Sequence, residues 1–249
     1  MRISGFTFIH NAIEGGYPIV EVIQALQPFT QEIVIVDAQS TDGTRQILER
    51  MAAKMGNHLR ILDGPWGDQA GQTLAALHAM HTACDGDIII HAEGDEVWDG
   101  MLLAEVVKRI KASQHDIAVH RIQVEQNFQR CRWYPWPVHR VFPKGTVRKV
   151  GETTDRRYDA LVLGPEHGYL WDVTNCFRDN WMGRVRNQAE LWHGEASYKA
   201  VPLHFAEGIE VVDTGTFLNQ EHWFRKRSPF DLPGPLKRLV GMTKYDPGV

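Results

Sequence analysis

Four apolar strands, each followed by a stretch with helical periodicity, fill the first half of the chain. The stretches after the strands carry apolar residues three and four positions apart, as in Ile47, Leu48, Met51 and Met55. Such alternation is typical of an α/β domain, in which helices flank both faces of a mostly parallel central sheet. The predicted strands are 3–9, 32–37, 58–63 and 87–92.

The pattern of predicted strands and helices changes after about residue 112. Short strand-like pieces with interleaved basic residues replace the alternation, and seven of the eight tryptophans lie from Trp98 onward. We therefore expect one continuous domain with a Rossmann-like half, 1–112, and a Trp-rich mixed α+β half, 113–249. Exposed tryptophans would suit a sugar or flat-ring acceptor, whereas buried ones would be large core residues, and the sequence favours neither reading.

Composition excludes several classes of protein. The formal net charge of -4 gives no general attraction to nucleic acid or to acidic membranes. Cys84, Cys131 and Cys176 form no C-x-x-C pair, which argues against a disulfide framework or a cysteine metal site and fits a reducing compartment. No stretch approaches the ~20 apolar residues that span a bilayer, and the first residues do not form a signal peptide. We expect a cytoplasmic protein.

Acidic residues follow the predicted strands. Asp37 ends the second strand, Asp63 and Asp68 follow the third, and Glu93 and Asp95 follow the fourth. Because the carboxyl ends of parallel strands share one edge, where ligands bind in such sheets, these side chains should gather there. Carboxylates that crowd together repel one another, so a bound cation would explain the cluster, and solvation beyond the strand end is the alternative.

The standard phosphate-binding and hydrolase motifs are absent. No G-x-G-x-x-G follows the first strand, and no G-x-x-x-x-G-K-[ST] occurs, which argues against dinucleotide oxidoreductases and P-loop NTPases. G-x-S-x-G and H-E-x-x-H are absent as well.

Three stretches resemble the family 2 glycosyltransferases of the GT-A fold. "FTFIHNAIEGGYPIVEVIQAL" is similar to the opening strand, turn and helix of that family, and "EIVIVDAQSTDGT" is similar to its V-D-D-G-S-T-D-G-T segment. "HAEGDEVW" stands where the family has its D-x-D motif. The resemblance covers residues 3–98 well and the remainder weakly. It implies a GT-A-type sheet, a nucleotide-sugar donor bound by 1–112 and an acceptor bound by 113–249.

The resemblance also implies a metal site. Mn²⁺ and Mg²⁺ prefer oxygen ligands and are often held by one or two carboxylates together with substrate phosphates. Asp95 is the expected ligand, and Glu93 would help directly or through water. His167 in "EHGY" is a further candidate ligand, with His204 in "VPLHF" as its rival, although a lone histidine is more often structural.

The donor nucleotide is expected to contact residues on both halves of the chain. Arg140 in "WPVHRVF" would contact phosphate, and its alternative is a surface arginine on a strand. Asp37 would meet the base. The expected nucleotide-binding residues are Thr7, Asn11, Asp37, Asp68 and Arg140.

A capped turn is the alternative for the residues after the second strand. Ser40 or Thr41 could cap the next helix, and Gly43 would ease the bend. We favour ligand contact for Asp37 and capping for Asp42.

The chain departs from the family pattern at three positions. Ala38 replaces the second aspartate of V-D-D-G-S, Gln39 replaces its glycine, and Glu93 replaces the first aspartate of D-x-D. The first two put the base contact in doubt, and the third weakens metal binding or leaves it to Asp95 alone.

The family resemblance implies inverting transfer, which requires a base to take the proton of the acceptor hydroxyl. "KVGETTDRR" offers Glu152 and Asp155, and we favour Asp155; both could equally be solvated loop acids. A UDP-like donor and a cell-envelope glycan or lipid-linked acceptor are expected, with a nucleic-acid base or a protein as acceptor alternatives.

The basic C-terminal segment could contact a membrane surface at its inner face or a polyanion such as DNA, and a solvated basic helix end is the plainer reading. Two other functions stay open. A nucleotidyltransferase would need a basic loop near the first strand, which "FIHNAIEGGYP" lacks, and a non-catalytic nucleotide-sugar-binding module would fit the departures at Ala38 and Glu93.

Overall fold

The computed structural model describes most of the chain. The described residues are 1–67, 69–112, 116–125, 130–133, 137–146, 160–180, 183–184, 187, 224–226, 232 and 234–248.

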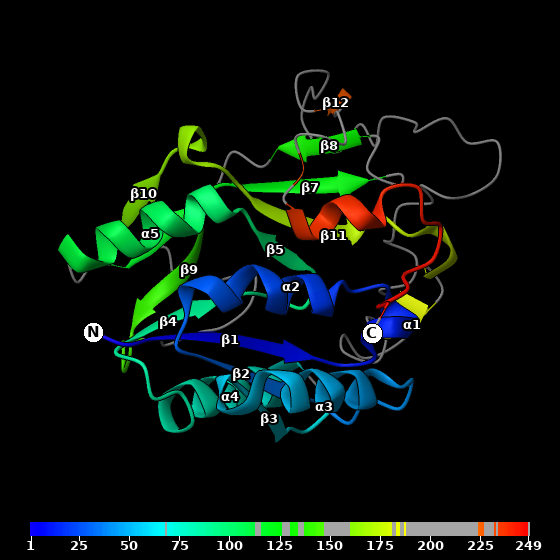
Figure 1. Ribbon diagram of the computed structural model, residues 1–249, viewed down its shortest axis with the longest axis horizontal. Coiled ribbons are helices and arrows are strands. Elements are labelled where there is room, and N and C mark those ends of the chain that lie inside the picture. The colour runs from blue at the N-terminus through cyan, green and yellow to red at the C-terminus, as the bar shows by residue number, and fades with distance from the viewer. Residues whose placement is uncertain are drawn as a thin grey trace.

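The first sheet has seven strands in the described part of the chain, in the order β10-β6-β9-β4-β1-β2-β3 (Figure 1). All neighbours pair in parallel except β9, which runs antiparallel to both β4 and β6. The predicted α/β fold with a mostly parallel sheet is therefore confirmed. The strands are β1 (Ile3–Ile9), β2 (Glu32–Asp37), β3 (Leu59–Asp63), β4 (Ile88–His91), β6 (Ile117–Val119), β9 (Val138–Pro143) and β10 (Leu161–Leu163).

A second sheet packs beside the first, with the order β12-β8-β7-β11-β5 among the described strands. Its β5 precedes residue 112, whereas β6, β9 and β10 of the first sheet follow it, so the two predicted halves exchange strands. The strands of the second sheet are β5 (Glu96–Trp98), β7 (Arg121–Glu125), β8 (Arg130–Trp133), β11 (Leu170–Asn175) and β12 (Phe224–Lys226).

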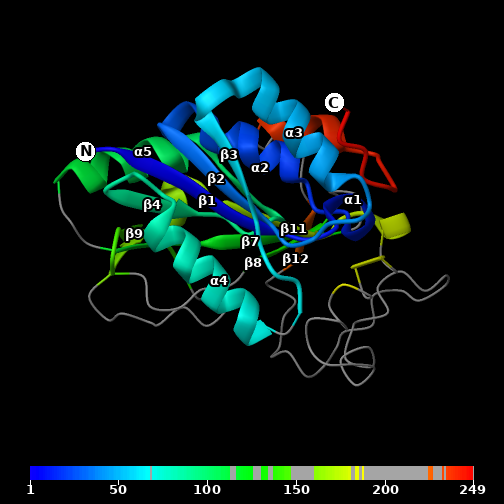
Figure 2. The same ribbon diagram turned by 90° about the horizontal axis from the view of Figure 1, so that it is seen from below.

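Helices cover both faces of the first sheet. Figure 2 shows α4 on one face and α2, α3 and α5 on the other. Alternate strand residues serve the two faces: Phe6 and Val34 pack with Met80 of α4, while Ile33 packs with Ile47 of α3. The helices are α1 (Ala12–Gly15), α2 (Ile19–Leu26), α3 (Thr44–Met55), α4 (Gln69–Thr82) and α5 (Gly100–Ala112), with 3₁₀ turns η1 (Gln27–Phe29), η2 (Gly56–His58), η3 (Pro165–His167), η4 (Arg178–Asn180) and η7 (Gly234–Leu239).

Two of the tryptophans belong to the core. Trp98 of β5 and Trp171 of β11 are both buried. For Trp98 and Trp171 the core reading is confirmed, because their side chains are closed to any acceptor. No helix in the described ranges is long and apolar enough to cross a membrane.

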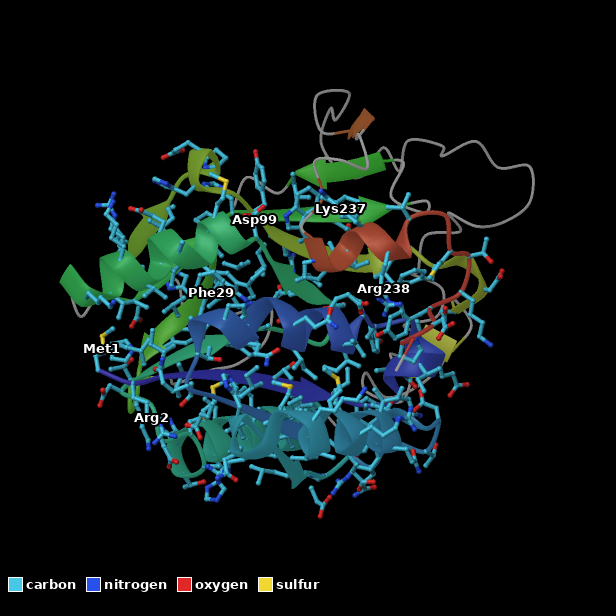
Figure 3. The ribbon with its side chains drawn as sticks, viewed as in Figure 1. Met1, Arg2, Phe29, Asp99, Lys237 and Arg238 are labelled. Carbon is cyan, nitrogen blue, oxygen red and sulfur yellow. The ribbon has the colours of Figure 1, made fainter. Side chains whose placement is uncertain are left out.

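The end of the chain returns to pack on α2, close to α1 (Figure 1). Leu236 and Leu239 of η7 are buried, and Arg238 forms an ion pair with Glu21 of α2. Figure 3 labels Arg238 where η7 meets that helix. The Tyr245 hydroxyl donates a hydrogen bond to Glu21 Oε2 at 3.1 Å. The positive charge of Arg238 is thus paired with the Glu21 carboxylate within the protein.

Glu21 should make stability depend on pH. Burial raises the pKa of Glu21 to about 7, although Arg238 opposes the shift. Its folded-state pKa therefore lies above the ordinary value of 4.5, and the folded protein binds more protons than the unfolded chain between the two. The free energy of unfolding should fall as pH rises through this window, by up to about 1.4 kcal/mol per pH unit.

Urea unfolding at pH 5 and pH 8 measures this effect. Glu21→Gln should lose less stability than the wild type between the two pH values, whereas Glu49→Gln, on the exposed surface of α3, should behave as the wild type does. Equal losses in the wild type and Glu21→Gln would contradict the assignment.

Candidate functional site at the carboxyl edge

The ends of four parallel strands meet at one border of the first sheet. Ile9 at the end of β1 pairs with Asp37 at the end of β2, which pairs with Asp63 at the end of β3. On the other side of β1, Phe6 pairs with His91 at the end of β4. These strand ends and the loops that follow them are called the carboxyl edge below. Ligands bind at this edge in open parallel sheets.

Asn11 joins two loops of the carboxyl edge. Its φ of 45° lies in the left-handed region, which asparagine tolerates better than most residues. The Asn11 N–H donates to Ser40 Oγ at 2.9 Å, and Asn11 Oδ1 accepts from the Thr41 N–H at 2.7 Å. Because Asn11 is only 7% exposed, its observed role is to hold the loops, and its contact with a donor stays a prediction.

Asp37 is almost enclosed at the end of β2. Asp37 is only 4% exposed, and its Oδ1 accepts a hydrogen bond from the Ser40 N–H at 3.3 Å. Oδ2 lies 3.6 Å from the Arg45 guanidinium, which also pairs with Asp63. The chain itself therefore balances part of the Asp37 charge, and the base contact stays a prediction.

Asp42 organises the turn before α3. Its Oδ1 accepts from the Thr44 N–H at 3.0 Å and from Thr44 Oγ1 at 2.6 Å, and its Oδ2 accepts from the Glu14 N–H at 2.7 Å. These bonds support the structural role favoured for Asp42, which lies one residue before the N-cap position of α3. Capping by Ser40 or Thr41 is wrong, because Gly43, with φ 96°, occupies the N-cap position.

Gln39 has a strained backbone. Its φ is 56°, in the left-handed region where a side chain meets its own backbone. The glycine that the family has here avoids this cost, and the exposed Gln39 side chain gains no burial in return. The structure thus explains the family glycine at this position.

Gln39→Gly should raise the free energy of unfolding by about 0.5–1 kcal/mol, since relief of the left-handed strain exceeds the entropy that glycine adds to the unfolded chain. Chemical unfolding measures the change. Gln39→Ala is the matched control and should give no gain, because alanine keeps the Cβ. A gain of the same size in both variants would exclude backbone strain as the cause.

Two carboxylates of the acidic stretch after β4 bind one arginine. Arg140 of β9 donates from Nε to Glu96 Oε2 at 2.7 Å and from Nη2 to Glu96 Oε1 at 2.8 Å. Nη2 also donates to Glu93 Oε1 at 2.7 Å. The Arg140 and Glu96 side chains are both 0% exposed, and that of Glu93 is 29% exposed. The strand end therefore carries acids partly to neutralise a buried guanidinium.

The ion-pair network separates the pKa values of the two acids. Burial opposes ionisation of Glu96, but the charge and hydrogen bonds of Arg140 outweigh it and lower the pKa of Glu96 to about 2. Burial raises the pKa of Glu93 to about 8 against the pull of Arg140. Arg121 of β7 extends the network, 3.7 Å from Glu96 and 3.6 Å from Asp172.

Arg140 does not have the position expected of a phosphate contact or of a surface arginine. Its side chain has no exposed surface, and three of its hydrogen bonds go to Glu93 and Glu96. The physical reason is the antiparallel pairing of β9 with β4, which brings Arg140 beside the acidic strand end within the protein.

Asp95 lies between these two glutamates but keeps a partly exposed side chain. Its carbonyl accepts from the Val173 N–H at 2.9 Å, which fixes it beside β11. Its carboxylate also acts on Tyr17: burial raises the pKa of that phenol to about 12, Arg184 opposes the rise, and Asp95 adds to it. Asp95, Tyr17 and Arg184 therefore lie near one another at the carboxyl edge.

The last acid of the stretch has a structural role. Asp99, labelled in Figure 3 at the start of α5, accepts from the Met101 N–H at 2.7 Å through Oδ1. Its carbonyl accepts from the Leu103 N–H at 2.9 Å. Asp99 is thus the N-cap of α5.

Residues 18–171, more than half of the chain, match the family profile described as Glycosyl transferase family 2. The chain belongs to glycosyl transferase family 2. The family inferred from the sequence resemblance is thereby confirmed. No curated protein matches the chain significantly.

Several solved structures resemble parts of this family 2 chain. TarS of S. aureus is 21% identical over 51% of this chain and 36% of its own, with a TM-score of 0.38. The mannosyltransferase PcManGT from Pyrobaculum calidifontis, in complex with GDP-Man and Mn2+, is 23% identical over 51% of this chain and 36% of its own, with a TM-score of 0.39. This chain thus spans about a third of either protein.

The three metal ligands predicted for this family 2 chain are not assembled. The Asp95 carbonyl accepts a hydrogen bond from Val173 of β11. His167 precedes the other end of β11, where Leu170 pairs with Trp98. The segment of β11 from Leu170 to Val173 alone spans roughly 10 Å. In the described part of the chain, no group of three or more His, Cys, Asp or Glu side chains could hold a metal ion. No three-residue set is thus found there, and metal binding by Asp95 with help from Glu93 stays a prediction.

Thr7 is a buried core residue and is not exposed at the carboxyl edge. It pairs with Ile35 in the middle of β1 and is completely buried, so its side chain has no surface with which to meet a nucleotide. Four other predicted residues, Asp68, Glu152, Asp155 and His204, lie outside the described residues.

The structure brings residues to the carboxyl edge that the sequence did not indicate. Tyr17 and Arg184 lie near Asp95, and Asn187 Nδ2 donates to the Asn11 carbonyl at 3.4 Å. His10 and Trp66 stack on each other after β1 and β3. Only the position of His10 and Trp66 after predicted strands could have pointed to them, and nothing local marks Arg184 or Asn187.

Proposed function

We propose that this chain is a metal-dependent, inverting glycosyltransferase that takes a sugar from a nucleotide diphosphate donor of the UDP type. Family membership over residues 18–171 carries the proposal. The partly exposed Asp95 at the carboxyl edge supports it, because this is the edge at which an α/β sheet binds its ligand.

The residues at the edge fit a hard divalent cation. Mn²⁺ or Mg²⁺ can be held by one carboxylate together with donor phosphates, and Asp95 would supply that carboxylate. Glu93 would assist through its second oxygen or through water, since Arg140 engages Oε1. The bound ion would offset the negative charge that develops on the departing diphosphate.

The acceptor side of the proposal rests on the family resemblance. Asp155, or Glu152 in its place, would take the proton of the acceptor hydroxyl. The acceptor would be a cell-envelope glycan or a lipid-linked sugar met at the inner face of a membrane, and a nucleic-acid base is the alternative acceptor.

Thermal unfolding with nucleotides tests the donor site. UDP, GDP, CDP and dTDP are each added with and without Mn²⁺. At ~100 times its dissociation constant a nucleotide should raise Tm by roughly 5–10 °C, and only with the metal. No shift with any of the four would overturn the donor-site assignment and favour a family member that has lost nucleotide binding.

A further inference from the structure

The C-terminal segment, residues 234–248, is bonded to η4. The Asp179 N–H donates to the Thr243 carbonyl at 2.8 Å, and Thr243 Oγ1 donates back to Asp179 Oδ2 at 2.6 Å. The Tyr245 N–H donates to Asn180 Oδ1 at 2.6 Å, and Tyr245 itself is buried. Hydrogen bonds in both directions therefore fix this segment to η4.

Asn180 bonds α1 as well. Its Nδ2 donates to the Ile13 carbonyl at 2.5 Å and to the Glu14 carbonyl at 3.2 Å. The last carbonyls of a helix need partners from outside the helix, and these two belong to α1. Because an amide carries donors and an acceptor together, the single side chain of Asn180 connects α1 with the C-terminal segment.

The connection is also closely packed. A Cβ at Gly16, whose φ is 67°, would come within 2.7 Å of the Asn180 side chain. A Cβ at Gly183 would come within 2.3 Å of the Glu14 carbonyl oxygen. Since neither glycine has room for a methyl group, α1 cannot shift independently of η4 and the residues that follow it.

α1 leads at both ends into the carboxyl edge. Asn11, which joins two loops of the edge, precedes it. Tyr17 follows it closely, and its phenol is hydrogen-bonded to Arg184 and lies near Asp95. A helix of four residues has too few hydrogen bonds to hold its own shape. The arrangement of Asn11 and Tyr17 therefore depends on contacts from outside α1, which Asn180 supplies.

We propose that Asn180 is a positioning residue through which the C-terminal segment holds α1 in the arrangement that binds the nucleotide diphosphate. Asn180 is only 3% exposed, so it acts through Asn11 and Tyr17 and is not itself a ligand of the nucleotide. The inference rests on the proposed function and deepens it by giving a remote segment a part in donor binding. Without Asn180, part of the binding free energy would be spent on ordering α1.

Calorimetric titration of UDP and GDP, each with Mn²⁺, tests the proposal, with urea unfolding of every variant beside it. Asn180→Ala should raise the Kd of the nucleotide that binds the wild type by about 10-fold. Asn180→Asp keeps an acceptor for the Tyr245 N–H but loses the donor to α1. It should raise the Kd as much as Asn180→Ala does.

Ser4→Ala is the matched control, at the opposite end of β1. Ser4 is also a buried polar residue with a donor bond, to Glu32, and an acceptor bond, from the Gly86 N–H. The substitution should lower the free energy of unfolding and leave the Kd unchanged. A rise in Kd equal to that of Asn180→Ala would mean that affinity follows general stability, and would overturn the positioning role.

A substitution within the C-terminal segment tests the path through Asn180. Arg238 pairs with Glu21 and donates to the carbonyls of Asp246 and Pro247 at 2.8 and 2.9 Å. Arg238→Met should loosen the segment and raise the Kd by roughly 3-fold. Added to Asn180→Ala it should have no further effect on the Kd, because the connection to α1 is already broken.

The remaining outcomes separate the two proposals. An unchanged Kd in Asn180→Ala or Asn180→Asp would overturn the positioning role and leave the donor site intact. Fully additive effects of Arg238→Met and Asn180→Ala on the Kd would exclude Asn180 as the connection. A wild type that binds neither UDP nor GDP would overturn the proposed function and this inference with it.

Discussion

Arg140→Met is expected to lower the free energy of unfolding by about 3–5 kcal/mol, the usual cost of breaking a buried ion pair by removing one partner. The substitution keeps most of the side-chain volume but leaves the Glu96 carboxylate buried without its bidentate donor. Without Arg140, burial should raise the pKa of Glu96 far above its value of about 2. The loss should therefore be larger at pH 8 than at pH 5, and urea unfolding at both pH values measures it.

A double variant separates the lost ion pair from lost packing. Arg140→Met with Glu96→Gln removes both charges, so it should recover a substantial part of the stability lost in the single variant. A loss of less than about 1 kcal/mol in Arg140→Met, the range of exposed pairs, would mean that this network is not closed to water. No recovery in the double variant would assign the loss to packing instead.

Asp95→Asn is expected to weaken metal-dependent binding of the nucleotide diphosphate by about 100-fold, because a bound ion stabilises diphosphate charge by several kcal/mol and the amide is a poor ligand for it. The substitution keeps the size of the side chain, and the backbone bond from Val173 to Asp95 is unaffected. Calorimetric titration with the nucleotide that stabilises the wild type, with Mn²⁺ or with a chelator, measures the effect.

Asp99→Asn is the matched control, four residues away in the same acidic stretch. Asparagine caps helices as well as aspartate does, so the bonds to Met101 and α5 should persist. This variant should bind nucleotide and metal as the wild type does. Equal losses in both variants would indicate a general effect of negative charge and would remove Asp95 from the metal site.

Predictions from the sequence succeeded where the signal is local. A strand or helix appears in the sequence as a period of two or 3.6 residues, so the first four strands and the helices after them were found. Asp42 bonds the backbone N–H of Thr44, only two positions ahead, so the structural role favoured for it could be found from the local sequence. The alternation of strands and helices also determined that the acids gather at one edge.

Predictions failed where a partner comes from far along the chain. Arg140 was expected to contact phosphate, but it binds Glu93, 47 residues earlier, because β9 runs antiparallel beside β4. Thr7 was expected to contact the nucleotide, but it is buried by the sheet around it. His167 was placed by a short motif, and only the pairing of β11 with β5 shows that it lies away from Asp95.

The sequence by itself determined the α/β fold, the family and the edge at which a ligand is expected, because periodicity and strand order are properties of neighbouring residues. Only the tertiary structure decided which carboxylate is enclosed with an arginine, which stays open to solvent, and that His10 meets Trp66 beside Ala38. Desolvation and pairing depend on segments that are distant in sequence, so the chemistry of each acid emerges only when the strands are assembled.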